Sequence, residues 1–351
     1  MLRDLALSIP NRSLTAAEIG HATKELLDAS VSAENKASFL SAWAQRGETA
    51  VELAICAEAF LPQAVNPGIC GTWNGRALLD CCGTGGGGLN LLNVSTGLMF
   101  ILSALGIPVV KHGNRGITKK SGSADVLESL GIKINLEPEQ VPHCLEEVGC
   151  AFLFAPAYHP SFAAIASVRC TLAEQGQRTI FNLLGPLLNP ARPDARLVGV
   201  FKPEHTLLYT KALEQMNCPS FSVVCGEDAP SGKRLGEVSA NGPTLLGGTL
   251  RHAKGEPFER LERKASPPQK IETLFVQNAE ESAKRLVDLL SGKEQGLGRE
   301  TLLINAAVAA WTHGTAASLE EGLAQSTEAI DLGRALECLK RWQKFSGKAA
   351  Q

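Results

Sequence analysis

A short apolar segment, a glycine-rich stretch and a second apolar segment follow one another between residues 77 and 105, and this succession constrains the fold most. Ala77–Cys82 has the length and composition of a buried strand, and Thr96–Leu105 is an apolar run of helical length that ends at Gly106. Gly83–Asn90 is made almost entirely of Gly, Thr and Asn, so its backbone can turn tightly and point N–H groups at an anion. The pattern predicts a phosphate-binding loop before the N-terminus of a helix.

Basic and amide side chains follow the next predicted strand. The strand expected at Ile107–Val110 leads directly into Lys111, His112, Asn114 and Arg115. Because ligands of an open α/β sheet bind at the carboxyl ends of its strands, we expect these side chains beside the glycine loop. The sequence therefore predicts a site for a phosphorylated ligand at this edge of the sheet.

The glycine loop also satisfies the dinucleotide fingerprint G-x-G-x-x-G, from Gly83 to Gly88. A dinucleotide site needs an acidic residue about 20 positions further on, and this chain has Lys111 and His112 in that region. The loop also lacks the Gly-Lys-Ser/Thr ending of a Walker loop. The residues favour a ligand that is not a dinucleotide, and the competing interpretation is a flexible connection followed by unrelated charges.

With 351 residues, the chain is longer than one usual compact domain, and we expect a large domain and a smaller one. The first 65 residues carry helical patterns, and Thr15 with Glu18 and Thr49 with Glu52 have the spacing of capping boxes. Strands and helices alternate after the glycine loop, with one strand expected at Ile132–Leu136, which predicts a parallel sheet. The predicted class is α/β: a small all-helical domain and a large α/β domain with a mainly parallel central sheet.

Charge and composition argue against several other classes of protein. Lys and Arg number 34, Asp and Glu number 36, and basic residues never form a block longer than two, which makes nucleic-acid binding an unlikely function. Asp4 and Pro10 interrupt the apolar residues at the N-terminus, so we expect neither a secretory signal nor a membrane span, and hence a cytoplasmic protein. The ten cysteines include no C-x-x-C pair, and we expect buried thiols.

Motifs along nearly the whole chain resemble the signature of the anthranilate phosphoribosyltransferase family. They are Gly83-Thr-Gly-Gly, Asn93-Val-Ser-Thr, Lys111-His-Gly-Asn-Arg115, Ser121-Gly-Ser-Ala-Asp125, Ala155-Pro-Ala-Tyr-His-Pro160 and Arg178-Thr-Ile-Phe-Asn-Leu-Leu-Gly-Pro186. The third and fourth motifs distinguish this family from the related pyrimidine nucleoside phosphorylases. The resemblance implies an enzyme of tryptophan biosynthesis that uses Mg²⁺ and moves 5-phosphoribose from phosphoribosyl pyrophosphate to the amine of anthranilate, releasing pyrophosphate.

The resemblance also implies how the chain is divided and assembled. An N-terminal helical domain would span residues 1–69, and the α/β domain that binds phosphoribosyl pyrophosphate would comprise residues 70–165 and 193–351. Residues 166–192 would be a helical insertion that packs on the N-terminal domain. The helical parts would pair two chains into a homodimer. Phe39, Leu40 and Trp43 support that pairing, because their apolar stripe is larger than so small a domain is expected to hide.

Carried over by position, the family's functional residues fall on these motifs. Contacts with phosphoribosyl pyrophosphate are implied for Gly83, Gly85, Gly86, Asn93, Ser95, Thr96, Lys111 and Ser123. The anthranilate channel is implied for Gly83, His112, Asn114, Tyr158, His159 and Arg169. The expected catalytic residues are Lys111, Asn114 and Arg169, and the expected protein ligands of Mg²⁺ are Ser95 and Glu237.

The chemistry agrees with this division into a phosphate side and an anthranilate side. A departing pyrophosphate needs hydrogen-bond donors and cations around it. The guanidinium of Arg169 can form two parallel hydrogen bonds with the carboxylate of anthranilate. Each side chain also has a purely structural interpretation. Asn93 and Ser95 could cap the following helix, His159 could be a turn histidine, and Arg169 could lie on the surface of its helix.

The chain departs from the family pattern in three places. Gly87 and Leu91 stand in the glycine loop where the family usually has Asp or Ser and then Thr. Gly236 precedes Glu237 where the family has an adjacent Asp-Glu metal pair, and Thr118-Lys119-Lys120 replaces a Ser-rich turn. Because Mg²⁺ is usually held by one or two carboxylates with substrate phosphates, we expect a weakened metal site that an Asp at position 236 would strengthen.

Two classes of function are therefore compatible with the sequence. The first is an active phosphoribosyltransferase for anthranilate or another aromatic acceptor, in which Lys119 or Lys120 offsets charge on pyrophosphate. The second is a non-catalytic paralogue that binds phosphoribosyl pyrophosphate, a nucleotide or nucleic acid without turnover.

Overall fold

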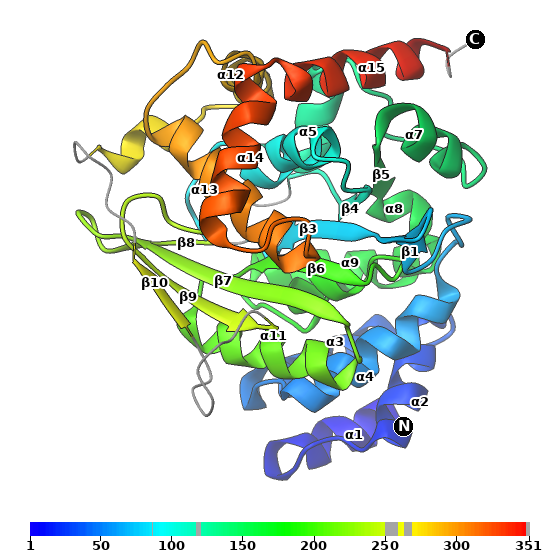
Figure 1. Ribbon diagram of the computed structural model, residues 1–351. Helices are drawn as coiled ribbons and strands as arrows, with labels where there is room; N and C mark the ends of the chain where they lie inside the picture. Colours follow the sequence, from blue (N-terminus) through cyan, green and yellow to red (C-terminus); the bar gives the residue numbers. More distant parts are fainter. Residues whose placement is uncertain (86, 117–120, 250–258, 263–268, 349–351) are drawn as a thin grey trace.

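The computed structural model describes residues 1–85, 87–116, 121–249, 259–262 and 269–348. Helices lie on both faces of one large sheet, and the N-terminal helices lie beneath it in the view of Figure 1. Among the described helices, we find none with the length and apolar character that a membrane crossing requires.

The N-terminal part consists of helices, and the second and fourth of them begin at the predicted caps. They are α1 (Leu2–Ser8), α2 (Ala16–Leu27), α3 (Ala33–Arg46) and α4 (Ala50–Phe60). Both predicted capping boxes are confirmed, since Thr15 and Thr49 each exchange hydrogen bonds with the glutamate three residues on. Glu52 is 1% exposed and also accepts the Leu14 N–H at 2.6 Å and the Arg46 guanidinium at 2.5 Å. This buried carboxylate therefore joins the start of α2 to α3 and α4.

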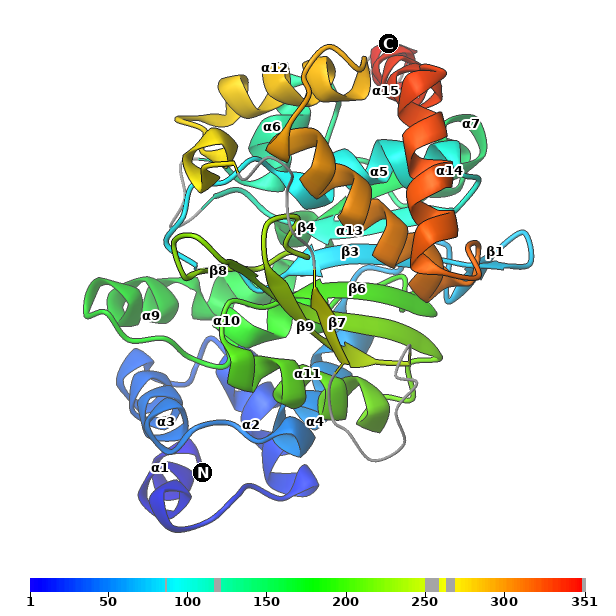
Figure 2. The ribbon, with the colours of Figure 1, turned by 60° about the vertical axis from the view of Figure 1, so that its left-hand side comes forward.

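The central sheet is mixed and mostly parallel, which confirms the predicted fold class. Its parallel strands are β3 (Leu79–Gly83), β4 (Val109–Gly113), β5 (Cys150–Phe154), β6 (Ala195–Gly199) and β7 (Ser220–Asp228). The antiparallel strands are β8 (Lys233–Leu235), β9 (Pro243–Gly248) and β10 (Glu259–Glu262). The strand order is β10-β9-β7-β6-β3-β4-β5, with β8 paired to β7, and Figure 2 shows β9 beside β7. A separate hairpin joins β1 (Thr72–Trp73) and β2 (Arg76–Ala77).

Register brings the carboxyl ends of the parallel strands to one edge. Gly83 at the end of β3 lies opposite Gly199 at the end of β6, and Gly113 at the end of β4 lies opposite Phe154 at the end of β5. The segments that follow these strands therefore meet at the edge where the sequence places the phosphate site.

One face of the sheet carries most of the later helices (Figure 1). These are α5 (Val94–Ala104), α6 (Ser123–Ser129), α7 (Gln140–Val148), α12 (Ala279–Leu290), α13 (Leu297–His313), α14 (Leu319–Asp331) and α15 (Arg334–Lys348). On the other side lie α11 (Pro203–Gln215), α9 (Ala163–Glu174) and the N-terminal helices, with the short α8 (Ala155–Tyr158) and α10 (Phe181–Leu184) in the connection between β5 and β6. Short 3-10 turns are η1 (Ile9–Asn11), η2 (Leu61–Gln63), η3 (Pro160–Phe162), η4 (Gly185–Leu187) and η5 (Ile271–Leu274).

The N-terminal helices share their hydrophobic core with the rest of the chain. One apolar cluster joins Phe60 of α4 to Ile165 of α9, Leu184 of α10 and Val223 of β7. The stripe of Phe39, Leu40 and Trp43 lies inside this cluster with exposed fractions of 0–1%. The inference of a dimer surface from this stripe is therefore wrong, because helices of the same chain cover it. The division at residues 69/70, 165/166 and 192/193 stays a prediction.

The strand expected at Ile132–Leu136 is also wrong. Ile132, Ile134 and Leu136 are buried as the alternating pattern requires, yet the segment pairs with no strand in the described part of the chain. Side chains take its backbone groups instead: Ser346 Oγ accepts the Lys133 N–H at 3.0 Å, and the Tyr158 hydroxyl donates to the Leu136 carbonyl at 3.0 Å. An extended segment can thus bury alternate residues without joining a sheet.

Candidate active site

The glycine loop connects β3 to α5 at the carboxyl edge of the sheet. The N–H of Thr84 donates to the carbonyl of Gly199 at 2.9 Å, which ties the start of the loop to the end of β6. Gly85 has φ +64°, a backbone conformation that side chains disfavour. Gly83 and Gly85 are exposed, so their backbone is accessible to a ligand, whereas Gly86 lies outside the described residues.

Asn93 precedes α5, and two serines hold its side chain. Its Oδ1 accepts hydrogen bonds from Ser121 Oγ at 2.8 Å and Ser282 Oγ at 3.0 Å. It forms no side-chain cap bond to α5, so helix capping does not explain it. Because both serines bond to the carbonyl oxygen, the amide nitrogen is the group left to donate to a ligand. Ser95 is half-buried in the first turn of α5, and Thr96 Oγ1 is buried without a hydrogen-bond partner among the described residues.

Asp125 closes the loop that follows β4. Its Oδ2 accepts the N–H groups of Gly116 at 2.9 Å and Gly122 at 2.8 Å, which brings both ends of the loop to the first turn of α6. Asn114 is exposed at the start of this loop, and Ser123 is half-buried at the start of α6. These two predicted site residues therefore lie at the carboxyl edge of β4. The predicted cations Lys119 and Lys120 lie outside the described residues.

Beneath the loop, buried charges cross three neighbouring strands. Lys111 on β4 is 2% exposed and donates to the carbonyl of Cys81 on β3. Asp80 on β3 is 1% exposed, accepts from Asn189 at 2.8 Å, and lies opposite Arg196 of β6, which is 4% exposed. Burial raises the pKa of Asp80, although Lys111 opposes the rise. Lys111 is bound to the backbone of β3 two residues before the loop begins, and this buried cation favours an anion in the loop.

Sequence reasoning did not identify Asp80, Asn189 or Arg196. The available signal was an acidic residue inside the apolar strand that precedes the loop, because a buried carboxylate needs cations and donors around it.

A row of aromatic contacts runs from the end of β4 to α9. The ring centroids of His112 and His159 are 5.2 Å apart, and those of His159 and Phe162 are 5.2 Å apart in a stacked arrangement. Phe162 meets Phe181 edge to face at 5.5 Å, and the Arg169 guanidinium lies 5.0 Å from the Phe181 centroid. The row therefore links His112, His159 and Arg169, which were predicted for the acceptor. Phe162 and Phe181, which the sequence analysis did not single out, lie between them.

Both histidines of the row are fixed by backbone carbonyls. His112 Nδ1 lies 3.2 Å from the Gly185 carbonyl, and His159 Nε2 lies 2.8 Å from the Leu188 carbonyl. Since a carbonyl only accepts, these nitrogens carry the protons, and His112 Nε2 is left as a buried acceptor without a described partner. Burial lowers the pKa of His112 to about 3 and also lowers that of His159. Both rings are therefore neutral at pH 7.

Arg169 and Tyr158 occupy different environments. Arg169 is half-buried, burial lowers its pKa, and no carboxylate in the described part of the chain forms an ion pair with it. Tyr158 is 1% exposed, and its hydroxyl is taken by the Leu136 carbonyl, so its side chain supports the turn after β5. Of these two, Arg169 alone offers a polar group to an acceptor.

Glu237 follows β8 and is half-buried. Burial is the main cause that raises the pKa of the Cys82 thiol, on β3, to about 12. The charge of Glu237 also raises this pKa, so the Glu237 carboxylate lies near the end of β3. The described residues contain no group of three or more His, Cys, Asp or Glu that could hold a metal ion.

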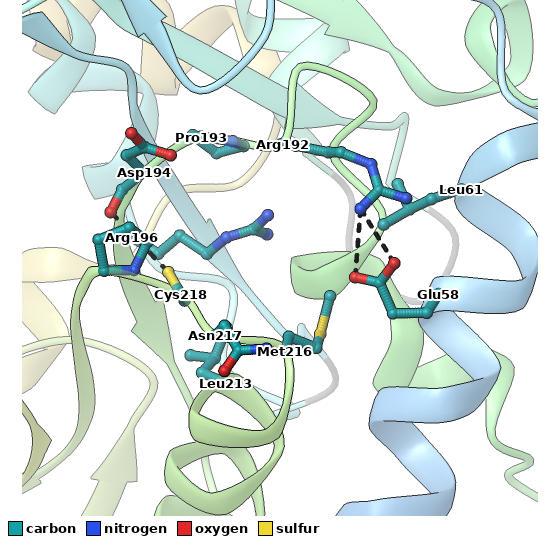
Figure 3. A pocket seen from close by; sticks show the side chains of 11 residues that line it. Glu58, Leu61, Arg192, Pro193, Asp194, Arg196, Leu213, Met216, Asn217 and Cys218 are labelled. Carbon is teal, nitrogen blue, oxygen red and sulfur yellow. Dashed lines mark hydrogen bonds and ion pairs between the residues drawn. The ribbon is translucent and has the colours of Figure 1, made fainter. Parts of the chain in front are cut away.

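A separate pocket of about 130 Å³ lies beside the amino end of β6 (Figure 3). Its charged lining residues are Glu58, Arg192, Asp194 and Arg196. Arg192 and Glu58 form an ion pair at 2.9 Å, and the two acids balance the two arginines. The pocket lies at the opposite end of β6 from the glycine loop and presents no excess charge to an ion.

Known proteins match this chain along its length. The helical bundle domain of the glycosyl transferase family matches residues 5–64, and the a/b domain of that family matches residues 75–336. The anthranilate phosphoribosyltransferase of Rubrobacter xylanophilus is 36% identical over 358 residues, covering 100% of this chain and 99% of the relative. That of Acetivibrio thermocellus is 35% identical over 343 residues, covering 96% and 94%.

Solved structures agree with these matches. The anthranilate phosphoribosyltransferase from Thermus thermophilus superposes with a TM-score of 0.86 at 34% identity, covering 98% of this chain and 99% of that one. The Saccharomyces cerevisiae enzyme, in complex with phosphoribosyl pyrophosphate and Mg, has the same fold, with a TM-score of 0.83, 24% identity and coverage of 99% and 98%. From the full-length matches, the chain belongs to the anthranilate phosphoribosyltransferase family.

Proposed function

We propose that this chain transfers 5-phosphoribose from phosphoribosyl pyrophosphate to the amine of anthranilate in tryptophan biosynthesis, with release of pyrophosphate. Full-length membership of the family supports the reaction. The observation that carries the choice of acceptor is Arg169, a half-buried guanidinium at the end of a row of rings that has no described carboxylate partner. A desolvated cation beside aromatic faces suits a planar aromatic carboxylate.

The phosphate side of the site is proposed to be the glycine loop and the start of α5. The backbone of Gly83, Gly85 and Gly86, the hydroxyls of Ser95, Thr96 and Ser123, and the amide of Asn93 would contact phosphoribosyl pyrophosphate. Lys111 would act from beneath the loop, because its ammonium is bound to the Cys81 carbonyl. Negative charge grows on the leaving pyrophosphate as its bond to C1 breaks, and fixed donors and buried cations stabilise that charge.

The acceptor side is proposed to be the row of rings with Asn114. Arg169 would pair with the anthranilate carboxylate, and Phe162 and Phe181 would contact its ring. The buried Nε2 of His112 would accept a hydrogen bond from the amine and hold its lone pair toward C1. With its pKa lowered to about 3, His112 would position the amine without retaining its proton, which would pass to the departing pyrophosphate or to solvent.

For Mg²⁺, we propose that Glu237 and Ser95 are the protein ligands and that phosphoribosyl pyrophosphate supplies the others. One carboxylate, one hydroxyl and phosphate oxygens form a set that Mg²⁺ accepts. When bound, the ion would neutralise charge on the departing pyrophosphate. The solved structure of the Saccharomyces cerevisiae enzyme is a complex with phosphoribosyl pyrophosphate and Mg.

We also propose a homodimer that pairs through the N-terminal helices. Leu7 of α1 is 76% exposed and Val51 of α4 is 51% exposed, so each of these helices carries a large apolar side chain that a second chain would cover. Light scattering at micromolar concentration should give about twice the 37.2 kDa chain mass. A monomer would refute the proposal, as would a dimer that survives Leu7→Lys combined with Val51→Lys.

The reaction is tested by following the loss of anthranilate with phosphoribosyl pyrophosphate and Mg²⁺ present. We expect turnover with anthranilate and much slower turnover with aniline, which lacks the carboxylate. Equal rates with both would contradict the role of Arg169. Binding of phosphoribosyl pyrophosphate without loss of anthranilate would favour another aromatic acceptor or the non-catalytic alternative.

A further inference from the structure

The ring of Phe201 lies between two glycines that belong to different parts of the site. Phe201 follows β6, Gly87 belongs to the glycine loop, and Gly236 precedes Glu237. A Cβ on Gly87 would lie 1.9 Å from Cε1 of the ring, and a Cβ on Gly236 would lie 2.6 Å from Cε2. Non-bonded carbons need about 3.5 Å, so neither position has room for a side chain while this ring is present.

Close backbone contacts continue the same arrangement. A Cβ on Gly199, at the end of β6, would lie 1.8 Å from the carbonyl oxygen of Gly236. The carbonyl of Gly199 accepts the Thr84 N–H at 2.9 Å. The end of β6 therefore touches both the start of the glycine loop and the turn that carries Glu237, and Phe201 contacts both segments two residues further on.

We propose that Phe201 is a positioning residue that holds the glycine loop at a fixed place relative to Glu237. Opposite edges of its ring, Cε1 and Cε2, face the loop and the turn, so neither segment can move toward the other while the ring stays in place. The proposal rests on the proposed function, because it assigns the loop to the phosphates and Glu237 to their metal. In this proposal, the Phe201 ring itself contacts neither phosphoribosyl pyrophosphate nor Mg²⁺.

We call this packing of the Phe201 ring between the glycine loop and the turn before Glu237 the clamp. It accounts for two departures from the family pattern with one side chain. Gly87 and Gly236 are separated by 149 positions in the chain, yet the same ring excludes a side chain from both. A packed aromatic ring thus holds the two segments where side chains at positions 87 and 236 are absent. The expectation that an Asp at position 236 would strengthen the metal site stays a prediction, and it requires the Phe201 ring to shift, because a Cβ there would overlap the ring.

The experiment compares Phe201→Ala and Phe201→Leu with wild type in steady-state kinetics and in calorimetric binding of phosphoribosyl pyrophosphate with Mg²⁺. Because misplacement by about 1 Å costs rate and affinity steeply, Phe201→Ala should raise the KM for phosphoribosyl pyrophosphate and the half-saturating Mg²⁺ concentration about tenfold or more. The KM for anthranilate should stay within about twofold. Phe201→Leu keeps part of the contact. Its KM for phosphoribosyl pyrophosphate and its half-saturating Mg²⁺ concentration should lie between those of wild type and Phe201→Ala.

A double-variant cycle tests the contact with Gly236. Gly236→Asp alone should weaken phosphoribosyl pyrophosphate binding, because the new side chain displaces the ring. Phe201→Ala combined with Gly236→Asp should bind more tightly than the product of the two single effects, since the ring is no longer in the way. Multiplicative effects would overturn the clamp.

The matched control is Phe345→Ala, which removes the same ring from the C-terminal helix, where Phe345 is 7% exposed in the core. It should lower thermal stability and leave both KM values unchanged. If Phe201→Ala binds phosphoribosyl pyrophosphate as wild type does, the clamp is overturned whatever its stability. If wild type binds phosphoribosyl pyrophosphate but does not convert anthranilate, the proposed acceptor fails while the binding data still decide the clamp. Absence of wild-type binding would overturn both.

Discussion

The guanidinium of Arg169 lies over the ring of Phe181, 5.0 Å from its centroid. Burial lowers the pKa of Arg169, and no carboxylate in the described part of the chain compensates for the lost hydration. A guanidinium stays protonated even so, which leaves a cation that gains from any carboxylate brought to it. The surface alternative for Arg169 is therefore not supported, because its side chain is half-buried against an aromatic ring.

Arg169→Ala should raise the KM for anthranilate by roughly 10- to 100-fold, since a hydrogen bond to a charged group contributes about 1.5–3 kcal/mol. Arg169→Lys should restore only part of the loss, because an ammonium cannot form the two parallel bonds of a guanidinium. Steady-state kinetics with each substrate varied would measure both effects. Arg192→Ala is the matched control, because Arg192 pairs with Glu58 at the opposite end of β6 and should leave both KM values unchanged.

His112 should make the protein less stable in acid. Its folded pKa is about 3 and its ordinary value is 6.5, so between these values the unfolded chain binds a proton that the folded chain excludes. The stability that depends on neutral His112 is present above pH 6.5 and is lost as the pH falls toward 3. Urea unfolding at pH 7, 5.5 and 4 should therefore show a smaller decline for His112→Gln than for wild type. The exposed His21→Gln should follow wild type, and parallel declines for all three proteins would contradict the argument.

Glu52 should be the residue on which the helical part depends most. Burial alone would raise its pKa, but hydrogen bonds from Arg46, Thr49 and Leu14 outweigh burial and hold the pKa below its ordinary value. Glu52→Ala leaves the half-buried guanidinium of Arg46 without its carboxylate, and we expect a loss of about 2–3 kcal/mol of the free energy of unfolding, below the range for fully buried pairs. Glu52→Gln should cost less, because it keeps an acceptor. Glu18→Ala, in the exposed capping box of α2, is the control, and an equal loss there would show that the buried network adds nothing.

Local signals in the sequence were sufficient for part of this structure. Thr15 and Thr49 start helices because a capping box is complete within four residues, and the alternation of strands and helices fixed the parallel sheet. The same signals failed where the outcome depends on a distant partner. Apolar residues recur at every second position in Ile132–Leu136 and at every third or fourth position in Phe39–Trp43. Each pattern indicates a buried face but not the segment that covers it.

The candidate site shows the same limit. The resemblance to a family proposed Asn93, His112 and Arg169 as site residues, and these assignments stay predictions. It missed the serine contacts that orient Asn93, one of them from Ser282, 189 positions away. It also missed Phe162 and Phe201, since a phenylalanine in a sequence looks like any other core residue until the fold places it.

Glu237 should set the Mg²⁺ requirement of the enzyme. Because the described residues offer no cluster that could hold the ion alone, Mg²⁺ would arrive with phosphoribosyl pyrophosphate and gain one carboxylate from the protein. Glu237→Ala should therefore raise the Mg²⁺ concentration at half-maximal rate and lower turnover by about tenfold or more. Glu237→Asp keeps a carboxylate, so its Mg²⁺ requirement and turnover should lie between those of wild type and Glu237→Ala. Initial rates against Mg²⁺ would be measured beside Glu227→Ala, which removes a nearby glutamate that pairs with Arg234 at 2.8 Å. If Glu237→Ala keeps the wild-type dependence on Mg²⁺, the ion is held by other groups and the assignment of Glu237 is wrong.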